Sequence, residues 1–220
     1  MNKYFLFLFC LSAFYGNAQV NDAGVWTSIN IEKKIAKGFT AGLSQEFRFN
    51  ENVSELGTAF TEVSVEHKII KRLSFGIGYR FIQSRNLDDS YSLRHRLLAD
   101  LSYRYKIKKV GIALRERFQS QVKDIQYGED GFAPVHYLRS KLNIKYAPEK
   151  KYAPWISAEV FYQLNNNKGN EIDNIRYTAG VDYDFNKRHS ISLFYLINKE
   201  VNTSDPLTEY ISGLSYKYSF

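Results

Sequence analysis

Apolar side chains recur at every second position in several long runs of this sequence. In the run from residue 73 to 81, Leu73, Phe75 and Ile77 alternate with small or polar residues. A period of two over such a length indicates β-strands with one apolar and one polar face, and it is incompatible with a helical repeat. The same alternation covers residues 93–107, 156–164 and 175–185.

Short basic turns alternate with longer polar loops between these runs. This alternation is typical of an up-and-down meander, in which neighbouring strands are antiparallel. The turns are Ala36-Lys37-Gly38, Lys71-Arg72, Lys108-Lys109, Glu149-Lys150-Lys151 and Asn186-Lys187-Arg188, and the loops are 50–56, 86–91, 123–133, 165–171 and 201–206. The strands predicted from this pattern are 24–35, 38–49, 57–70, 72–85, 92–107, 109–122, 134–147, 153–164, 172–185, 188–200 and 207–220.

The length and the polarity of these strands favour a membrane barrel over a soluble one. Each strand exceeds the roughly 9–11 tilted residues that cross a bilayer. The polar face mixes charges with small residues, which suits a crowded lumen, and the apolar face ends in Tyr and Phe at both margins. The pattern therefore predicts an all-β fold, an antiparallel up-and-down transmembrane β-barrel of about 10–12 strands. The glycines of the polar face are Gly76, Gly78, Gly111, Gly180 and Gly213.

The first residues have the pattern of an export signal. Lys3 precedes an apolar segment from Tyr4 to Tyr15, and Gly16-Asn17-Ala18 provides a small-residue cleavage site. We expect residues 1–18 to be a cleaved signal peptide and residues 19–220 to form a single barrel domain. Cys10 is the only cysteine and lies inside the signal, so the mature chain has no thiol or disulfide chemistry.

The last strand carries aromatic residues on one face up to the final residue. This segment resembles the C-terminal strand of Gram-negative outer-membrane proteins, which the barrel-assembly machinery reads. The resemblance implies a location in the outer membrane, with its lipid and the assembly machinery as partners. The residues of this expected assembly signal are Leu214, Tyr216, Tyr218 and Phe220.

Three further motifs lie in the first half of the chain. They are Gly24-Val25-Trp26-Thr27, Gln45-Glu46-Phe47-Arg48-Phe49 and Gly76-Ile77-Gly78-Tyr79-Arg80-Phe81. With these motifs the mature chain resembles an uncharacterised DUF-type family of small outer-membrane β-barrels. The resemblance implies no activity for the protein.

The predicted strand order contains a conflict of direction. The terminal Phe220 should lie at the periplasmic end, which places the short turns there and the longer loops outside. Counting back through eleven strands then starts the first strand outside, although the exported N-terminus should begin in the periplasm. Two interpretations stay open: a ten-strand barrel over 38–220 with residues 24–35 in the lumen or along the rim, or a twelve-strand barrel with one strand missed.

Composition excludes some partners once the two faces are separated. The formal net charge is +7, but the charges are scattered in alternation and form no contiguous patch for nucleic acid. The mean hydropathy of −0.39 is the average of an apolar and a charged face. The loop acids Asp88-Asp89 and Glu129-Asp130, and the amides Asn165-Asn166-Asn167, match no calcium-loop spacing, so we expect neither a metal nor a cofactor.

The predicted lumen face gathers more charge than a minimal barrel needs. We favour a structural barrel plugged by salt bridges, since buried charges must pair and ten strands are close to the size that side chains fill. The alternative is a narrow basic pore, with small anions as ligands if the lumen is open. The candidate lumen residues are Glu46, Arg48, Glu62, Glu66, Arg80, Arg94, Arg96, Asp100, Arg104, Arg115, Arg117, Arg139, Lys141, Glu159 and Asp182.

No catalytic constellation stands out, so we expect a protein that is not an enzyme. A lipid-modifying hydrolase of the outer membrane is the first alternative, because such enzymes need a His and a nucleophile two positions apart on one face. Paired carboxylates such as Glu62 and Glu66 are a weak glycosidase signal, and a loop-borne binding or adhesion function is the second alternative. All four histidines lie on the apolar register near strand ends, but the residues two positions on are not nucleophiles. The histidines are His67, His95, His136 and His189, followed by Ile69, Leu97, Leu138 and Ile191.

Overall fold

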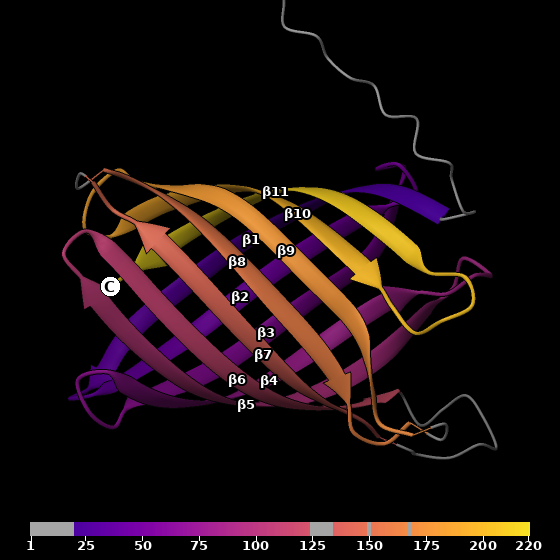
Figure 1. Cartoon of the computed structure of the whole chain (residues 1–220), viewed down its shortest axis with the longest axis horizontal. Helices are drawn as coiled ribbons and strands as arrows, with labels where there is room; N and C mark the ends of the chain where they lie inside the picture. The colour runs from indigo at the N-terminus through magenta and orange to yellow at the C-terminus, as the bar shows by residue number, and fades with distance from the viewer. Residues whose placement is uncertain (1–19, 124–133, 149–150, 167–168) are drawn as a thin grey trace, which may run out of the picture.

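The computed structural model describes residues 20–123, 134–148, 151–166 and 169–220, and these form a closed β-barrel (Figure 1). The expected signal peptide 1–18 and the pair Glu129-Asp130 lie outside the described residues. No helix in the described part of the chain is long and apolar enough to cross a membrane. The strands are β1 (Val20–Ala36), β2 (Phe39–Asn50), β3 (Glu55–Lys68), β4 (Leu73–Arg85), β5 (Tyr91–Ile107), β6 (Val110–Lys123), β7 (Val135–Tyr146), β8 (Tyr152–Gln163), β9 (Glu171–Asp184), β10 (His189–Glu200) and β11 (Leu207–Ser219).

Neighbouring strands along the chain pair as antiparallel hairpins, as the alternation of turns and loops predicts. One of the two-residue turns is Lys37-Gly38, where Gly38 has a φ of 82° that glycine adopts without steric cost. We call the end of the barrel with these short turns the turn end, and the opposite end the loop end. Phe220 follows β11 at the turn end, beside β1.

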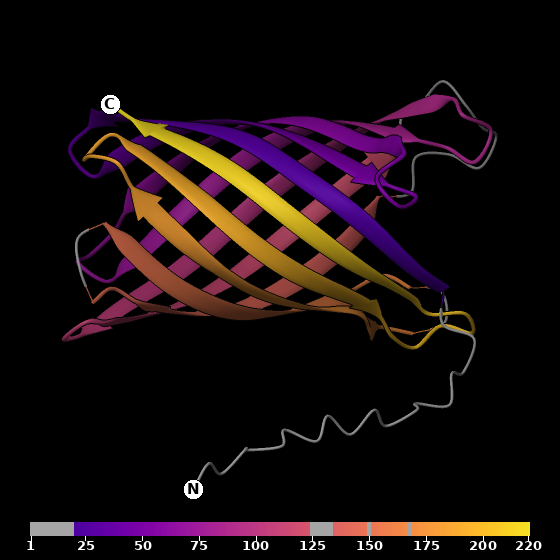
Figure 2. The same cartoon turned by 90° about the horizontal axis from the view of Figure 1, so that it is seen from above.

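The barrel closes through a parallel pair of strands. β1 lies beside β11 in register from Val20↔Leu207 to Glu32↔Ser219, and the two strands run in the same direction (Figure 2). A closed meander with an odd number of strands must contain one parallel pair, and this barrel has eleven strands.

The expected all-β barrel of 10–12 strands is confirmed, with the parallel closing pair as its one departure from an antiparallel order. Both interpretations of the direction conflict are wrong. The segment 24–35 is part of the wall, since β1 pairs with both β2 and β11. No further strand is needed, because the parallel ladder already uses the hydrogen-bonding edges of β1 and β11.

The two faces of the wall are the reverse of those of a soluble barrel. Apolar side chains on the outer face are exposed, with Ile77 at 57% and Leu193 at 61%. Charged side chains on the inner face are buried, with Arg80 at 9% and Glu159 at 2%. A soluble barrel hides its apolar register inside, so the sequence-based choice between the two barrel types agrees with the direction of the side chains.

Candidate binding site in the lumen

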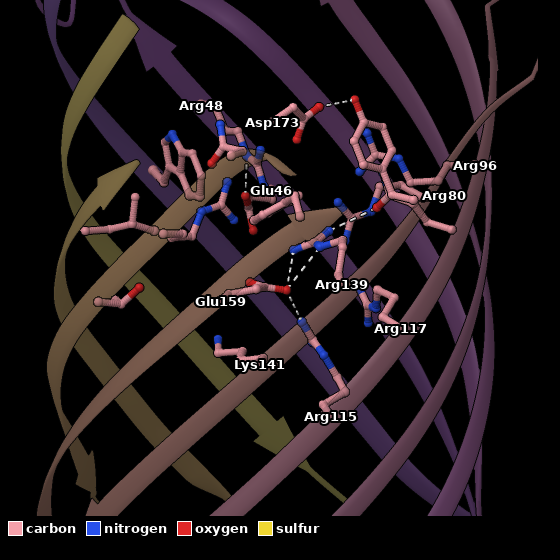
Figure 3. Close-up of a pocket in the computed structure, with 18 of the residues that line it drawn as sticks. Glu46, Arg48, Arg80, Arg96, Arg115, Arg117, Arg139, Lys141, Glu159 and Asp173 are labelled. Atoms are coloured by element: carbon pink, nitrogen blue, oxygen red, sulfur yellow. Dashed lines mark hydrogen bonds and ion pairs between the residues drawn. The ribbon is translucent and has the colours of Figure 1, made fainter. Parts of the chain in front are cut away.

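The inner face of the barrel carries all the charged residues predicted to face the lumen. Nine of them line a cavity of about 690 Å³ that extends from mid-height toward the loop end (Figure 3). The nine are Glu46, Arg48, Arg80, Arg96, Arg115, Arg117, Arg139, Lys141 and Glu159. The others, Glu62, Glu66, Arg94, Asp100, Arg104 and Asp182, share the inward register but do not line this cavity.

Glu159 lies at the centre of the charged region and joins two strands to its own. Its Oε1 accepts hydrogen bonds from Arg115 Nη2 at 2.7 Å and from Arg139 Nε at 3.0 Å (Figure 3). Arg139 also donates to Gln119 Oε1 at 3.1 Å. These residues come from β6, β7 and β8, so one buried carboxylate fixes guanidinium groups from two neighbouring strands across the lumen face.

Three more ion pairs join neighbouring strands or residues around the wall. Arg117 binds Asp100 through two parallel hydrogen bonds of 2.6 Å, the bidentate geometry that suits arginine. Arg80 Nε donates to Glu62 at 2.7 Å. Within β2, Arg48 Nε donates to Glu46 at 2.6 Å.

Aromatic rings alternate with guanidinium groups along the same inner face. Arg80 lies 3.8 Å from the Phe60 ring centre, and Arg48 lies 5.2 Å from Phe60 and 3.7 Å from Trp26. The alternation crosses to the opposite wall through Arg176, which lies 5.1 Å from Trp26. Cation–π contacts of this kind stabilise guanidinium groups that are shielded from water.

The alternation ends on the β7–β8 side of the lumen. Arg176 lies 4.9 Å from the Phe161 ring centre, and Arg139 lies 4.1 Å from the same ring. Arg139, one of the two arginines that bind Glu159, therefore also stacks on an aromatic ring. Ion pairs and cation–π contacts together hold the charged side chains in fixed positions.

The wall formed by β1, β10 and β11 carries an apolar patch on its inner face, beside polar residues such as Ser28 and Ser215, which share a hydrogen bond of 2.8 Å. Trp26, Leu196 and Ile211 form a buried cluster, and Phe194 packs against it. Gly213 faces this cluster, and a side chain there would collide with the Phe194 ring. Apolar side chains from β1, β10 and β11 thus fill the part of the lumen where the chain closes.

The sequence reasoning missed the uncharged and aromatic members of the site. Trp26, Phe60 and Phe161 lie on the inward register, where the pattern is otherwise polar. Arg176 was on the polar face of its run but was absent from the predicted set. An aromatic residue on the polar register is the signal that could have identified these positions, since a lumen ring needs a partner such as a guanidinium.

Four of the six predicted charges outside the cavity lie toward the barrel ends, whereas Glu62 and Asp100 lie beside it and pair with Arg80 and Arg117. Arg104 pairs with Glu66 at 2.8 Å, and Lys145 pairs with Asp182 at 2.5 Å, both toward the turn end. Arg94 lies toward the loop end and lines a separate pocket. These pairs are more exposed than the Glu159 cluster, so they contribute less to stability.

Asp88 and Asp89, the described loop acids among those considered for calcium, already have partners. The Ser90 hydroxyl donates to Asp88 at 2.6 Å, and this hydrogen bond lowers the pKa of Asp88. Arg85 pairs with Asp89 at 2.6 Å. Within the described residues no group of three or more His, Cys, Asp or Glu side chains is placed to hold a metal ion.

The four histidines contact aromatic rings on the outer face. His67 stacks on Phe39 with ring centres 4.1 Å apart. His95 and His189 share hydrogen bonds of 2.6 Å with the hydroxyls of Tyr79 and Tyr216. The fourth histidine is described with its neighbours below.

His136 has a serine across the strand pair that the search along single strands missed. Ser120 of β6 is its register partner on β7, and the His136 ring stacks on Phe118 with centres 5.7 Å apart. In the described part of the chain no hydrogen bond joins Ser120 and His136. The pair therefore lacks the contact by which a base activates a nucleophile.

Comparisons with known proteins agree with the fold. The family model described as "Protein of unknown function (DUF2490)" matches residues 23–208. The comparison with curated proteins gives no match. The barrel is similar to the crystal structure of the β-domain of the Bordetella autotransporter BrkA, with a TM-score of 0.52 and 12% identity over 85% of this chain and 86% of that one.

Proposed function

Because the chain belongs to the DUF2490 family, whose description gives no function, we propose from its own structure that it is an outer-membrane β-barrel of structural type. Its lumen is closed at mid-height by ion pairs, and it is not an enzyme. The observation that carries the proposal is the reversal of faces, with Ile77 exposed outside and Glu159 buried inside. A bilayer is the solvent that makes such a wall stable.

The dimensions of the wall support a membrane location. The strands have 12 to 17 residues, whereas roughly 9–11 tilted residues cross the hydrocarbon layer. Aromatic pairs such as Tyr218–Phe220, with ring centres 4.6 Å apart, lie at the turn end as an interfacial girdle would. The likeness to an autotransporter β-domain supports the outer membrane as its location.

The folded protein is expected to be extracted with outer-membrane detergent fractions and to migrate faster on a gel when it is not heated. A closed barrel resists dodecyl sulfate at room temperature because every backbone group of the wall is paired. The measurement compares unheated and boiled samples of the purified protein. Heat-independent mobility together with solubility in water would contradict the membrane barrel.

The Glu159 cluster supports a closed lumen rather than a pore. In the proposed plug, an ion that passes mid-height separates Arg115 or Arg139 from the carboxylate they share, and breaking a buried ion pair is costly. Phe161 stacks on Arg139 and helps to hold its guanidinium in place at the same level. We therefore favour a plugged barrel over a narrow anion channel.

Labelling of single cysteines is expected to place the loop end outside the cell. In a Cys10→Ser background, Leu87→Cys and Asn202→Cys should react with an impermeant maleimide on intact cells, because the proposed orientation places the turn end in the periplasm and these loops outside. Asn21→Cys should react too, since β1 starts at the loop end. Lys187→Cys is the matched turn-end control.

Two labelling results would contradict this orientation. Reaction of Lys187→Cys on intact cells, with Leu87→Cys protected, would reverse it. Reaction of Leu87→Cys without reaction of Asn21→Cys would contradict the parallel closure.

A lipid hydrolase is the second candidate, favoured by the facing positions of Ser120 and His136. We rank it below the structural barrel because the two side chains share no hydrogen bond within the described residues, and because the His136 ring is stacked on Phe118. Phospholipid hydrolysis by the purified protein that is lost in both Ser120→Ala and His136→Ala would make this the function instead.

A further inference from the structure

The lumen cavity holds more positive charge than its carboxylates neutralise. Its lining, as far as the structure describes the chain, includes eight Arg or Lys side chains and four carboxylates. Glu62 and Asp100 lie beside the cavity and pair with Arg80 and Arg117. One carboxylate, Glu159, serves two guanidinium groups. The cavity therefore retains uncompensated cations.

Three lining cations have no carboxylate partner among the described residues. Arg96 donates to the neutral amide of Gln121, and Arg176 donates to the amide of Asn198 at 3.2 Å. Lys141 lies opposite Glu159 in the β7–β8 register, but its ammonium makes neither a hydrogen bond nor an ion pair in that part of the chain. The three side chains are partly buried, and a cation shielded from water without a counter-charge is unstable unless an anion or water completes it.

These three cations surround the cavity from different strands. Arg96 lies on β5, Lys141 on β7 and Arg176 on β9. Figure 3 shows Arg96 and Lys141 on different sides of the Glu159 cluster. One point charge cannot contact all three sides, so the complementary ligand carries more than one negative group.

Unsatisfied polar atoms in the same lining define the rest of the ligand. Arg115 Nε is a buried donor without a partner, and Asp173 Oδ1 and Asn174 Oδ1 are buried acceptors without one. Asp173 and Asn174 come from β9 near the loop end. Anionic oxygens would satisfy the donor, and hydroxyl groups would satisfy the two acceptors.

We propose that this cavity binds a small hydroxylated organic anion with more than one negative charge, either a hydroxycarboxylate or a sugar phosphate. The cavity of about 690 Å³ is large enough for such a molecule. The site rests on the proposed barrel with a closed lumen, because a plug at mid-height makes the cavity a blind chamber rather than a passage.

Titration calorimetry of the purified barrel in neutral detergent tests the site, with citrate and glucose 6-phosphate as separate probes. We expect saturable one-to-one binding of one of them, and the probe that binds distinguishes the two sources of anionic oxygens. Lys141→Gln and Arg96→Gln should each weaken this binding about tenfold or more, because each removes an unpaired cation from the cavity.

Lys145→Gln is the matched control. Lys145 lies on the same face of β7 as Lys141, but it pairs with Asp182 and does not line the cavity. It should leave the affinity unchanged. If Lys141→Gln and Lys145→Gln bind the probe with equal affinity, the binding reflects a general attraction by positive charge, and this result would overturn the site.

Absence of binding by either probe would also overturn the site. Each variant is first examined for heat-dependent gel mobility, so loss of the fold is recognised separately from loss of binding. A wild-type protein that keeps this mobility but binds no probe would refute the anion site and leave the barrel proposal intact.

Discussion

Replacing Glu159 by glutamine is expected to destabilise the folded barrel by about 3–5 kcal/mol, the loss found when one partner of a buried ion pair is removed. The substitution keeps the shape and one carbonyl oxygen but removes the charge that Arg115 and Arg139 share. Two buried guanidinium groups then face each other across β6 and β7 without a counter-charge. The measurement is denaturant unfolding in lipid vesicles, followed as a lower midpoint with an unchanged slope.

Glu66→Gln is the control for this prediction. Its ion pair with Arg104 has side-chain exposures of 43% and 56%, so its loss should change the free energy of unfolding by about 1 kcal/mol or less. If Glu159→Gln is as stable as Glu66→Gln, the Glu159 cluster is hydrated and the closed-lumen proposal loses its main support.

The strands of the barrel could be predicted from the sequence because each hairpin is encoded locally. A period of two sets the faces, and basic turns with glycine, such as Lys37-Gly38, set the reversals. The predicted strand 24–35 is observed as Val20–Ala36. Its early part pairs with β11 at the far end of the sequence, and no local signal encodes that extension.

Closure could not be predicted because it joins the two ends of the chain. Eleven strand ranges are predicted and eleven strands are observed, but both interpretations of the barrel, with ten or twelve strands in the wall, assumed an antiparallel order throughout. The conflict of direction in the predicted strand order was itself the signal of a parallel pair, because a closed meander of eleven strands must contain one. A parallel ladder between β1 and β11 satisfies the backbone as well as an antiparallel one.

The sequence could predict which charged residues face the lumen, but it could not predict which side chains they contact. Inward register placed Glu159 and Arg139 on one face, and the pairing of β7 with β8 then brings them together. The stacking of Arg48 on Trp26 depends on how β1 and β2 align. Such alignment is set by turn lengths and a bulge near Lys34, which periodicity does not reveal.

The outer face contains one carboxylate that periodicity alone left unexplained. Glu116 lies midway along β6 on the exposed apolar register, between Leu114 and Phe118. The structure supplies its partner, since Ser140 Oγ of β7 donates to it at 2.6 Å. A neighbouring hydroxyl lowers the cost of a polar group on this face, and only the β6–β7 register brings the two side chains together.

Removal of the three residues Arg115, Arg139 and Glu159 is expected to convert a non-conducting barrel into an anion-selective channel. In planar bilayers the wild-type protein should show no steady conductance. The triple variant Arg115→Ser, Arg139→Ser and Glu159→Ser removes the shared carboxylate together with both guanidinium groups that it binds, so it leaves neither arginine without its counter-charge. It should therefore fold more stably than Glu159→Gln and conduct steadily.

The expected selectivity follows from the cations that stay in the lumen of this variant. Arg96 and Arg176 have no carboxylate partner within the described residues, so their field favours anions over cations. The control is Glu66→Ser with Arg104→Ser, which removes an ion pair near the turn end and should remain silent. Steady conductance of the wild-type protein would instead support the narrow pore. A triple variant that does not conduct would mean that Phe161 and the Trp26 cluster, rather than the ion pairs, close the lumen.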